Sequence, residues 1–215
     1  MRGLFVSPAQ FRHQMKSLKL LGYQGCSINE LMSRFRKKET RKVFGITFDD
    51  GYEDVYIHAL PILQELGFTA TTYFVSAEVG GFNRWDVDSG IPQSACMTLQ
   101  QLREWKALGQ EVGGHTVNHR RLGELAQEDA RSQIADCRHA LEDMSGDPVE
   151  AFSYPYGSFN PTTPMLVREA GFTSAVSTRK KRTIEADDPY CLPRLNVRYP
   201  DMLGIFLWKC LIREL

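Results

Sequence analysis

Two short polar motifs carry the side chains that could do chemistry. In the first, Asp49 and Asp50 follow an apolar run and precede Gly51; in the second, His115 and His119 follow another apolar segment. One carboxylate and two imidazoles form a three-ligand site for Zn²⁺ or a similar divalent cation, with positions left open for water and substrate. The second carboxylate is then free to act as a general base. This combination indicates a metal-assisted hydrolase.

The four side chains have different predicted roles. Asp50 supplies the oxygen ligand, whereas Asp49 points another way along the chain and serves as the base toward an attacking water. His115 and His119 are four residues apart, a spacing that on a helical turn places both rings on one side. Each motif alone is commoner as a turn or a surface feature, so only their joint occurrence supports a site.

Alternating strands and helices must position these motifs. Apolar runs alternate with segments of helical periodicity, which is typical of an α/β protein with parallel strands. The expected strands cover residues 43–48, 70–75, 111–113, 172–176 and 192–197, with another ending in the turn at 152–157. The expected helices begin after the cap Ser7 and cover 8–21, 29–35, 52–66, 99–108, 127–144 and 164–170, with Pro61 bending or splitting the third.

The polar residues fall at strand ends. Asp49, Asp50, His115 and Tyr156 all come just past expected strands. In parallel barrels the catalytic groups gather at the carboxyl ends of the strands. These placements therefore support one another, whereas His13, His58 and His139 have no partner pattern and are interpreted as surface or packing residues.

Composition limits the class of protein. A chain of 215 residues suits a single domain over residues 1–215, and 42% hydrophobic residues are enough for a sizeable core. Lys+Arg and Asp+Glu both number 26, so the formal net charge of zero gives no indication of a nucleic-acid partner. The basic clusters at 34–38 and 179–182 are interpreted as solvated loops, with contact to lipid headgroups as the alternative.

Cysteine usage and hydropathy bear on location. The five cysteines include no CxxC pair, and an odd, unpatterned set is typical of a reducing compartment. We find neither an apolar leader segment nor a run of about 18 apolar residues, so the expected location is cytoplasmic unless a leader precedes this sequence. The apolar stretch 203–212 is expected to close the barrel as a packed helix, with an interfacial membrane helix as the alternative.

The motifs resemble those of a known family. The segments TFDDGY (47–52), HTVNH (115–119) and YPYG (154–157) are similar to the first three signature motifs of the polysaccharide deacetylases, the NodB-homology proteins of carbohydrate esterase family 4. The resemblance implies a distorted (β/α) barrel of about six to seven units with parallel strands, closed or open on one side. It also implies metal-dependent removal of an acetyl group, most often N-acetyl, from a carbohydrate.

Residue roles follow from the resemblance position by position. Asp49 matches the general base, and Tyr156 matches the residue whose backbone N–H stabilises the oxyanion. Asp50, His115 and His119 match the metal ligands. The implied cofactor is a divalent metal, with zinc favoured. The implied partner is an N-acetylhexosamine-containing sugar in a polysaccharide or a glycolipid precursor, and the reaction hydrolyses a carbon–nitrogen bond other than a peptide bond.

Two positions depart from the family pattern. Ser153 stands where the third motif usually carries an arginine that braces the catalytic aspartate. We predict that Arg194, on the expected last strand, reaches that place, with a surface arginine as the alternative. No histidine follows His139, so the family's late general acid is not visible. The leaving amine would then take its proton from Asp49 acting twice, from water, or from another group.

Substrate contacts and other functions stay open at this point. Trp85 and Phe82 lie in a long loop and suit stacking on sugar rings beside Pro155 and Tyr156, with packing on the barrel as the alternative. Two histidines and one carboxylate also hold Fe(II) in oxygenases, although the additional Asp49 favours hydrolysis. The departures also leave open a non-catalytic carbohydrate-binding barrel with a retained metal site.

Overall fold

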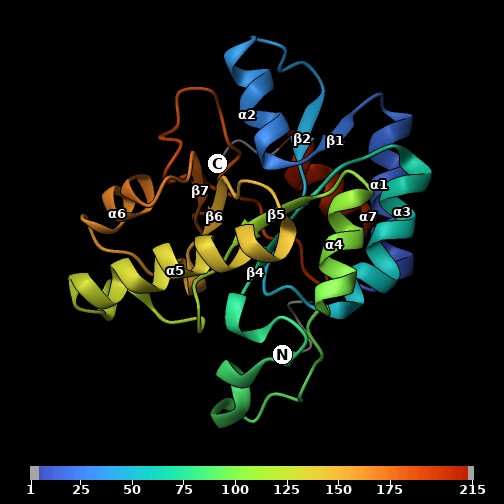
Figure 1. Cartoon of the computed structure of the whole chain (residues 1–215). Helices are drawn as coiled ribbons and strands as arrows, with labels where there is room; N and C mark the ends of the chain where they lie inside the picture. Colours follow the sequence, from blue (N-terminus) through green and yellow to red (C-terminus); the bar gives the residue numbers. More distant parts are fainter. Residues whose placement is uncertain (1–4, 213–215) are drawn as a thin grey trace.

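A curled parallel sheet forms the centre of the fold. The structure is a computed structural model, and it describes residues 5–212. Five parallel strands follow one another in space as in sequence, and they form a half-barrel (Figure 1). They are β3 (Thr47–Phe48), β4 (Thr71–Phe74), β5 (Glu111–Gly114), β6 (Ala151–Ser153) and β7 (Ser174–Val176).

A second, two-stranded parallel sheet precedes the main one. It consists of β1 (Gln24–Cys26) and β2 (Val43–Gly45), and only Ile46 separates β2 from β3. The predicted strand 43–48 is therefore divided between the two sheets. Sequence reasoning did not identify β1, because three residues are too few to show a period.

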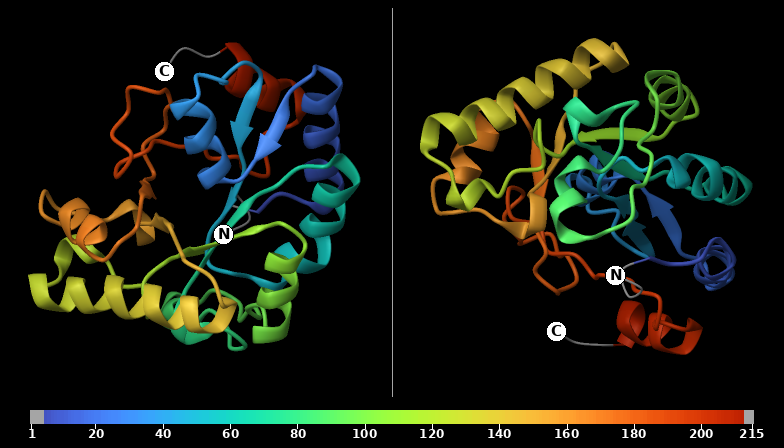
Figure 2. Two further views of the ribbon diagram at one scale, coloured as in Figure 1. Left: turned by 45° about the horizontal axis from the view of Figure 1, so that its top comes forward. Right: turned by 90° about the horizontal axis from the view of Figure 1, so that it is seen from below.

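Helices surround the sheet, as the two further views show (Figure 2). They are α1 (Pro8–Leu20), α2 (Ile28–Arg36), α3 (Leu60–Leu66), α4 (Leu99–Ala107), α5 (Gln127–Ser145), α6 (Thr163–Glu169) and α7 (Leu203–Leu207). Short 3₁₀ segments cover Ser76–Glu78, Arg84–Ser89, Leu122–Glu124 and Pro155–Gly157, and wider π-type segments cover Val55–Ala59 and Trp208–Ile212.

Local sequence signals set several helix ends. The Ser7 side chain accepts a hydrogen bond from the Gln10 amide at the start of α1, as predicted. Thr98 and Gln101 form a reciprocal capping box at the start of α4. Pro61 lies just after the π-type segment Val55–Ala59, at the start of α3, and the helical backbone continues through residues 53–66, so the helix expected over 52–66 changes its winding before the proline and does not split in two.

The predicted strand 192–197 is wrong. Only Leu192 pairs with β7, through an isolated parallel bridge to Val176. Pro193 follows at once and has no N–H to extend a ladder, so the chain leaves the sheet. The segment nevertheless stays beside β7, because the Arg194 amide donates to the carbonyl of Arg179.

Strand side chains alternate between two hydrophobic clusters. Phe74 and Phe152 face the outer helices, whereas Tyr73 and Ala151, their neighbours along β4 and β6, face the inside of the curled sheet. The helix α2 covers the interior from one end, and in Figure 1 it lies opposite the segment 76–98, drawn in green. This leaves the other end, where the strands finish, open for a site.

The segment 203–212 packs as a helix, as predicted. Phe206 of α7 is buried, and α7 lies against α1. Across residues 5–212, no helix combines the length and the apolar character that crossing a membrane needs. All five cysteines are free, and burial raises the pKa of the Cys26 and Cys96 thiols to about 12.

The turn after β6 is predicted to require Gly157. This glycine has φ +67°, and a Cβ added there would clash with Oγ1 of Thr178. Gly90 has the same φ of +67° but faces open space. We expect Gly157→Ala to lower the free energy of unfolding by about 1–3 kcal/mol more than Gly90→Ala does. The Gly90→Ala variant has only the cost of placing alanine in the left-handed backbone region, without a clash. Urea denaturation of both variants measures this, and equal losses would contradict it.

Candidate active site

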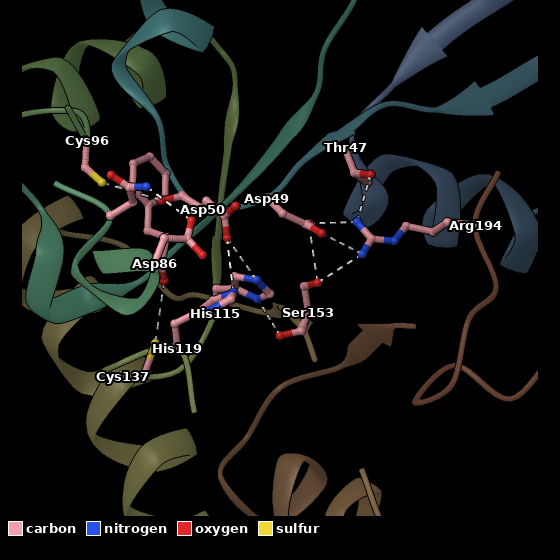
Figure 3. A network of polar contacts seen from close by, with 12 residues as sticks. Thr47, Asp49, Asp50, Asp86, Cys96, His115, His119, Cys137, Ser153 and Arg194 are labelled. Carbon is pink, nitrogen blue, oxygen red and sulfur yellow. Dashed lines mark hydrogen bonds and ion pairs between the residues drawn. The ribbon is translucent and has the colours of Figure 1, made fainter. Parts of the chain in front are cut away.

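Three predicted ligands meet at the carboxyl ends of β3 and β5. Asp50 follows β3, and His115 directly follows β5, with His119 in the turn beyond it. Oδ1 of Asp50 lies 3.2 Å from Nε2 of His119 and 3.5 Å from Nε2 of His115 (Figure 3). Within residues 5–212 these three form a group whose potential ligand atoms all lie within 4.8 Å of one another.

The two imidazoles do not converge through a helical turn, so that part of the sequence interpretation is wrong. Thr116 and His119 have φ +65° and +56°, in the left-handed region that interrupts a helix. The amides of Ser76 and Ala77 donate to the carbonyls of Thr116 and Val117, so this turn is fastened to the end of β4. The two rings therefore come together through an irregular turn that is held by the 3₁₀ segment after β4.

The hydrogen bonding of His115 favours a cation at this point. Its Nδ1 lies 2.7 Å from the backbone oxygen of Ser153, which can only accept, so Nδ1 carries the proton. In the neutral ring, Nε2 then presents a lone pair to Asp50. Two acceptors repel unless positive charge lies between them. Oδ1 of Asp50 and Nδ1 of His119 are also buried without a hydrogen-bond partner in the described part of the chain. The donor set fits a divalent cation.

The electrostatics of the group agree with this view. Burial opposes ionisation of Asp50, but the attraction of the His115 and His119 rings outweighs it and holds the pKa of Asp50 well below its usual range. Burial likewise opposes protonation of His115, yet Asp50 and Asp49 raise the pKa of that ring. The pKa of His119 is lowered, because burial there outweighs the attraction of Asp50. The group thus concentrates negative charge that a cation would balance.

Asp49 faces away from the ligand group and accepts two hydrogen bonds from Arg194. Nη1 of Arg194 lies 2.7 Å from Oδ1 of Asp49, and Nη2 lies 2.8 Å from Oδ2. The same guanidinium donates to Oγ1 of Thr47, Oγ of Ser153 and the carbonyl of Ser177. Burial tends to raise the pKa of Asp49, but the guanidinium outweighs it, so the pKa is lowered. This is the bidentate geometry that makes arginine–carboxylate pairs strong.

Ser153 and Arg194 occupy one network, as Figure 3 shows. Ser153 is fully buried at the end of β6, where the family pattern led us to expect an arginine. Its hydroxyl accepts a hydrogen bond from Nη2 of Arg194, which reaches Asp49 from the segment after β7. The sequence singled out both residues, but not Thr47, whose hydroxyl is the second one to accept a hydrogen bond from Arg194.

Aromatic rings flank His119 on two sides. The Trp85 ring lies 4.7 Å from the His119 ring between centroids, and the Tyr156 ring lies 4.5 Å away. A cavity of about 370 Å³ opens here, lined among others by Trp85, His119, Arg121 and Tyr156. Phe82 and Pro155 do not line this cavity, since Phe82 lies under the Arg84 guanidinium and Pro155 is buried.

One buried acid near the cavity was not found from the sequence. Asp86 is 7% exposed and accepts a hydrogen bond from Nδ2 of Asn83. Burial raises the pKa of the Tyr156 hydroxyl, and the charge of Asp86 adds to that effect. Its position directly after Trp85 is the only signal that the sequence offered. His13, His58 and His139 are exposed on helical segments, as predicted.

Comparison with known proteins identifies the family. The family model for polysaccharide deacetylase matches residues 36–175, which include Asp49, Asp50, His115, His119 and Tyr156. The chain belongs to the polysaccharide deacetylase family. It is 30% identical over 203 residues to "Putative polysaccharide deacetylase YxkH" of Bacillus subtilis strain 168, covering 94% of this chain and 68% of that protein.

A further relative and two solved structures extend the comparison. The poly-beta-1,6-N-acetyl-D-glucosamine N-deacetylase of Staphylococcus aureus strain MRSA252 is 23% identical over 196 residues, covering 89% of this chain and 67% of that protein. The Streptococcus pyogenes deacetylase PplD, solved in complex with acetate, has a TM-score of 0.83 at 26% identity, covering 96% of this chain and 88% of that one. IcaB from Ammonifex degensii has the same fold, with a TM-score of 0.79 at 24% identity over 94% of this chain and 89% of that one. The half-barrel is therefore the polysaccharide deacetylase fold.

Cation binding is predicted to depend on the histidine pair. We expect His119→Ala to weaken Zn²⁺ binding by about 100-fold or more, since loss of a direct ligand should exceed the effect of an outer-shell partner. His139→Ala, on the exposed face of α5, is the matched control and should bind as the unaltered protein does. Isothermal titration of chelator-treated protein with Zn²⁺ measures both. Equal affinities for the two variants would place the cation elsewhere.

The Arg194 pair is predicted to stabilise the fold. Arg194→Ala should lower the free energy of unfolding by about 1–3 kcal/mol, because Asp49 loses two charged hydrogen bonds. The Asp49 side chain is 34% exposed, so the loss stays below that of a fully buried pair. Adding Asp49→Asn to the Arg194→Ala variant should recover part of this loss of stability, because no unpaired charge then remains. Denaturation of both single variants and the double variant forms a cycle, and purely additive losses would show no coupling.

Proposed function

We propose that this chain hydrolyses the N-acetyl group of an N-acetylhexosamine residue in a carbohydrate, releasing acetate and a free amine. The observation that carries the proposal is the Asp50–His115–His119 group with a second carboxylate, Asp49, held beside it but outside it. Membership of the polysaccharide deacetylase family supports it, and one relative is named for N-deacetylation of poly-beta-1,6-N-acetyl-D-glucosamine. The substrate is a polysaccharide or a glycolipid precursor.

Zinc is the cation that we propose for the site. Two imidazole nitrogens and one carboxylate oxygen are a normal zinc set that leaves positions open. Bound there, a divalent cation would supply Lewis-acid polarisation of the acyl carbonyl and activation of water. Asp50, His115 and His119 would hold it, and the bond from His115 to the Ser153 carbonyl would fix the orientation of that ring.

Asp49 is the proposed general base. Its carboxylate is fixed by Arg194 and is not a member of the ligand group, so it is available to take the proton of the attacking water. Arg194 is a positioning residue in this scheme, because it acts through Asp49. We propose that Asp49 also returns the proton to the leaving amine, since the histidines of residues 5–212 outside the ligand group are exposed on helical segments.

Tyr156 and Trp85 are the proposed contacts to substrate. Tyr156 has φ +59° in the turn after β6, and its backbone N–H is the proposed donor to the oxyanion. The rings of Tyr156 and Trp85 flank His119 and would stack on sugar faces. Pro155, the residue before Tyr156, is buried. We propose that it supports the turn and does not contact the sugar.

The other functions left open by the sequence have less support. The hypothesis of a non-catalytic barrel rested on two missing family residues, the arginine of the third motif and the late histidine. Arg194 lies beside Asp49, where that arginine was expected. An Fe(II) oxygenase would give no role to a carboxylate held next to the ligands. We also propose that the chain acts as one catalytic domain, since residues from 15 to 206 share one hydrophobic cluster. A cytoplasmic location stays a prediction from the sequence.

Asp49 is proposed to take part in the reaction and not in cation binding, so its substitution should affect only the reaction. Asp49→Asn should lower acetate release from N-acetylglucosamine oligosaccharides by about 10²–10⁴-fold, because the variant cannot accept the proton of water. Its Zn²⁺ affinity should stay close to that of the unaltered protein, since Asp49 is not a ligand. Enzyme-coupled acetate detection and calorimetry measure the two quantities, with Asp129→Asn on the exposed face of α5 as the control.

Each contrary result has a distinct meaning. Undiminished acetate release by Asp49→Asn would remove Asp49 from the base role. Loss of Zn²⁺ binding in that variant would make Asp49 a ligand. An unaltered protein that binds Zn²⁺ but releases no acetate from any acetylated sugar would favour the non-catalytic barrel.

A further inference from the structure

Two arginines line the cavity beside the candidate metal site without an acidic partner. Arg120 and Arg121 directly follow His119, and both are exposed. Glu124 lines the same cavity, yet no ion pair joins it to either guanidinium within the described residues. Other arginines of this chain do find carboxylates, as the pairs Arg34–Glu30, Arg131–Glu169 and Arg138–Glu142 show.

The position of Arg121 directs its charge toward the site. Its guanidinium carbon lies 3.9 Å from the centre of the Tyr156 ring, and that ring lies 4.5 Å from the His119 ring. Stacking uses the flat face of a guanidinium and leaves the N–H groups at its edge free to donate. The donors of Arg121 are therefore available within the cavity, one ring away from a proposed metal ligand.

Acidic charge near the cavity comes from Glu124 on its wall and from Asp86 and Asp50, whose charges act on Tyr156, but within residues 5–212 no ion pair joins any of them to Arg120 or Arg121. Guanidinium groups stay protonated at all working pH values, so neighbouring Arg120 and Arg121 repel each other. On the wall itself, the two arginines lie with a single carboxylate, that of Glu124. A group with two acceptor oxygens would relieve the repulsion and match the fork of an arginine.

We propose that Arg120 and Arg121 bind a phosphate or carboxylate group of the carbohydrate, next to the sugar that loses its acetyl group. This inference rests on the proposed function and names its substrate class, an anionic glycan rather than a neutral one. Trp85 and Tyr156 would hold sugar faces, while the arginines would select the charged neighbour.

The test compares three acetylated substrates of similar length. One is a neutral N-acetylglucosamine oligosaccharide, one alternates N-acetylglucosamine with a uronic acid, and one carries a phosphate on the sugar next to N-acetylglucosamine. The unaltered protein should show a higher kcat/KM for acetate release from one anionic substrate than from the neutral one. Added NaCl should reduce this preference, because salt screens exposed charges. The favoured anion identifies the group as carboxylate or phosphate.

Charge-removing variants assign the preference to the two arginines. Arg120→Gln and Arg121→Gln should each lower the anionic-to-neutral ratio of kcat/KM by about tenfold, mainly through KM, as expected for loss of one charged hydrogen-bond partner. Arg41→Gln removes the same charge from an exposed position outside the cavity, and its ratio should match that of the unaltered protein. Thermal unfolding confirms that each variant is folded.

The outcomes separate this inference from the proposed function. Equal kcat/KM for neutral and anionic substrates, or arginine variants whose ratio does not change, would overturn the inference and leave deacetylation standing. Calorimetry of the Asp49→Asn variant measures the affinity for the same sugars without their being hydrolysed. One further result would reject deacetylation and retain the anion-binding proposal. In that result no substrate releases acetate, anionic sugars bind about tenfold tighter than neutral ones, and Arg121→Gln removes the difference.

Discussion

The structure depends on keeping two adjacent carboxylates ionised at the end of one strand. Asp49 and Asp50 are neighbours in the chain, and each charge raises the cost of ionising the other. The fold separates them in direction and supplies a different partner to each. Arg194 grips Asp49 from the segment after β7, whereas Asp50 faces two imidazoles at the end of β5. One carboxylate is therefore balanced by the protein, and the other is left for a cation.

Several unusual backbone positions serve this separation. Asp50, Thr116, His119 and Tyr156 all have positive φ and all lie at the carboxyl end of the sheet. Such positions cost free energy and persist only where surrounding contacts hold them. Here the contacts come from neighbouring strands, such as the bond from the His115 amide to the carbonyl of Phe74. The curled sheet thus holds the site in place, while loops supply its cavity wall.

Sequence reasoning succeeded where a signal is local. The caps at Ser7 and Thr98 depend on neighbouring residues, so the pattern predicted them. It failed for β1 and for residues 192–197, because strand formation depends on which distant segment is available to pair. The helical interpretation of His115 and His119 failed for a related reason, since their turn is held by the segment after β4.

By itself, the sequence determined the candidate ligand types, their order and the family, because these are properties of residue identity and spacing. Only the tertiary structure decided that Arg194 and Ser153 share one network with Asp49, and that Arg120 and Arg121 meet the cavity without a carboxylate partner. The reason is physical. Charge pairing acts over a few ångströms in space, and residues 145 positions apart in the chain come that close only when the sheet has curled.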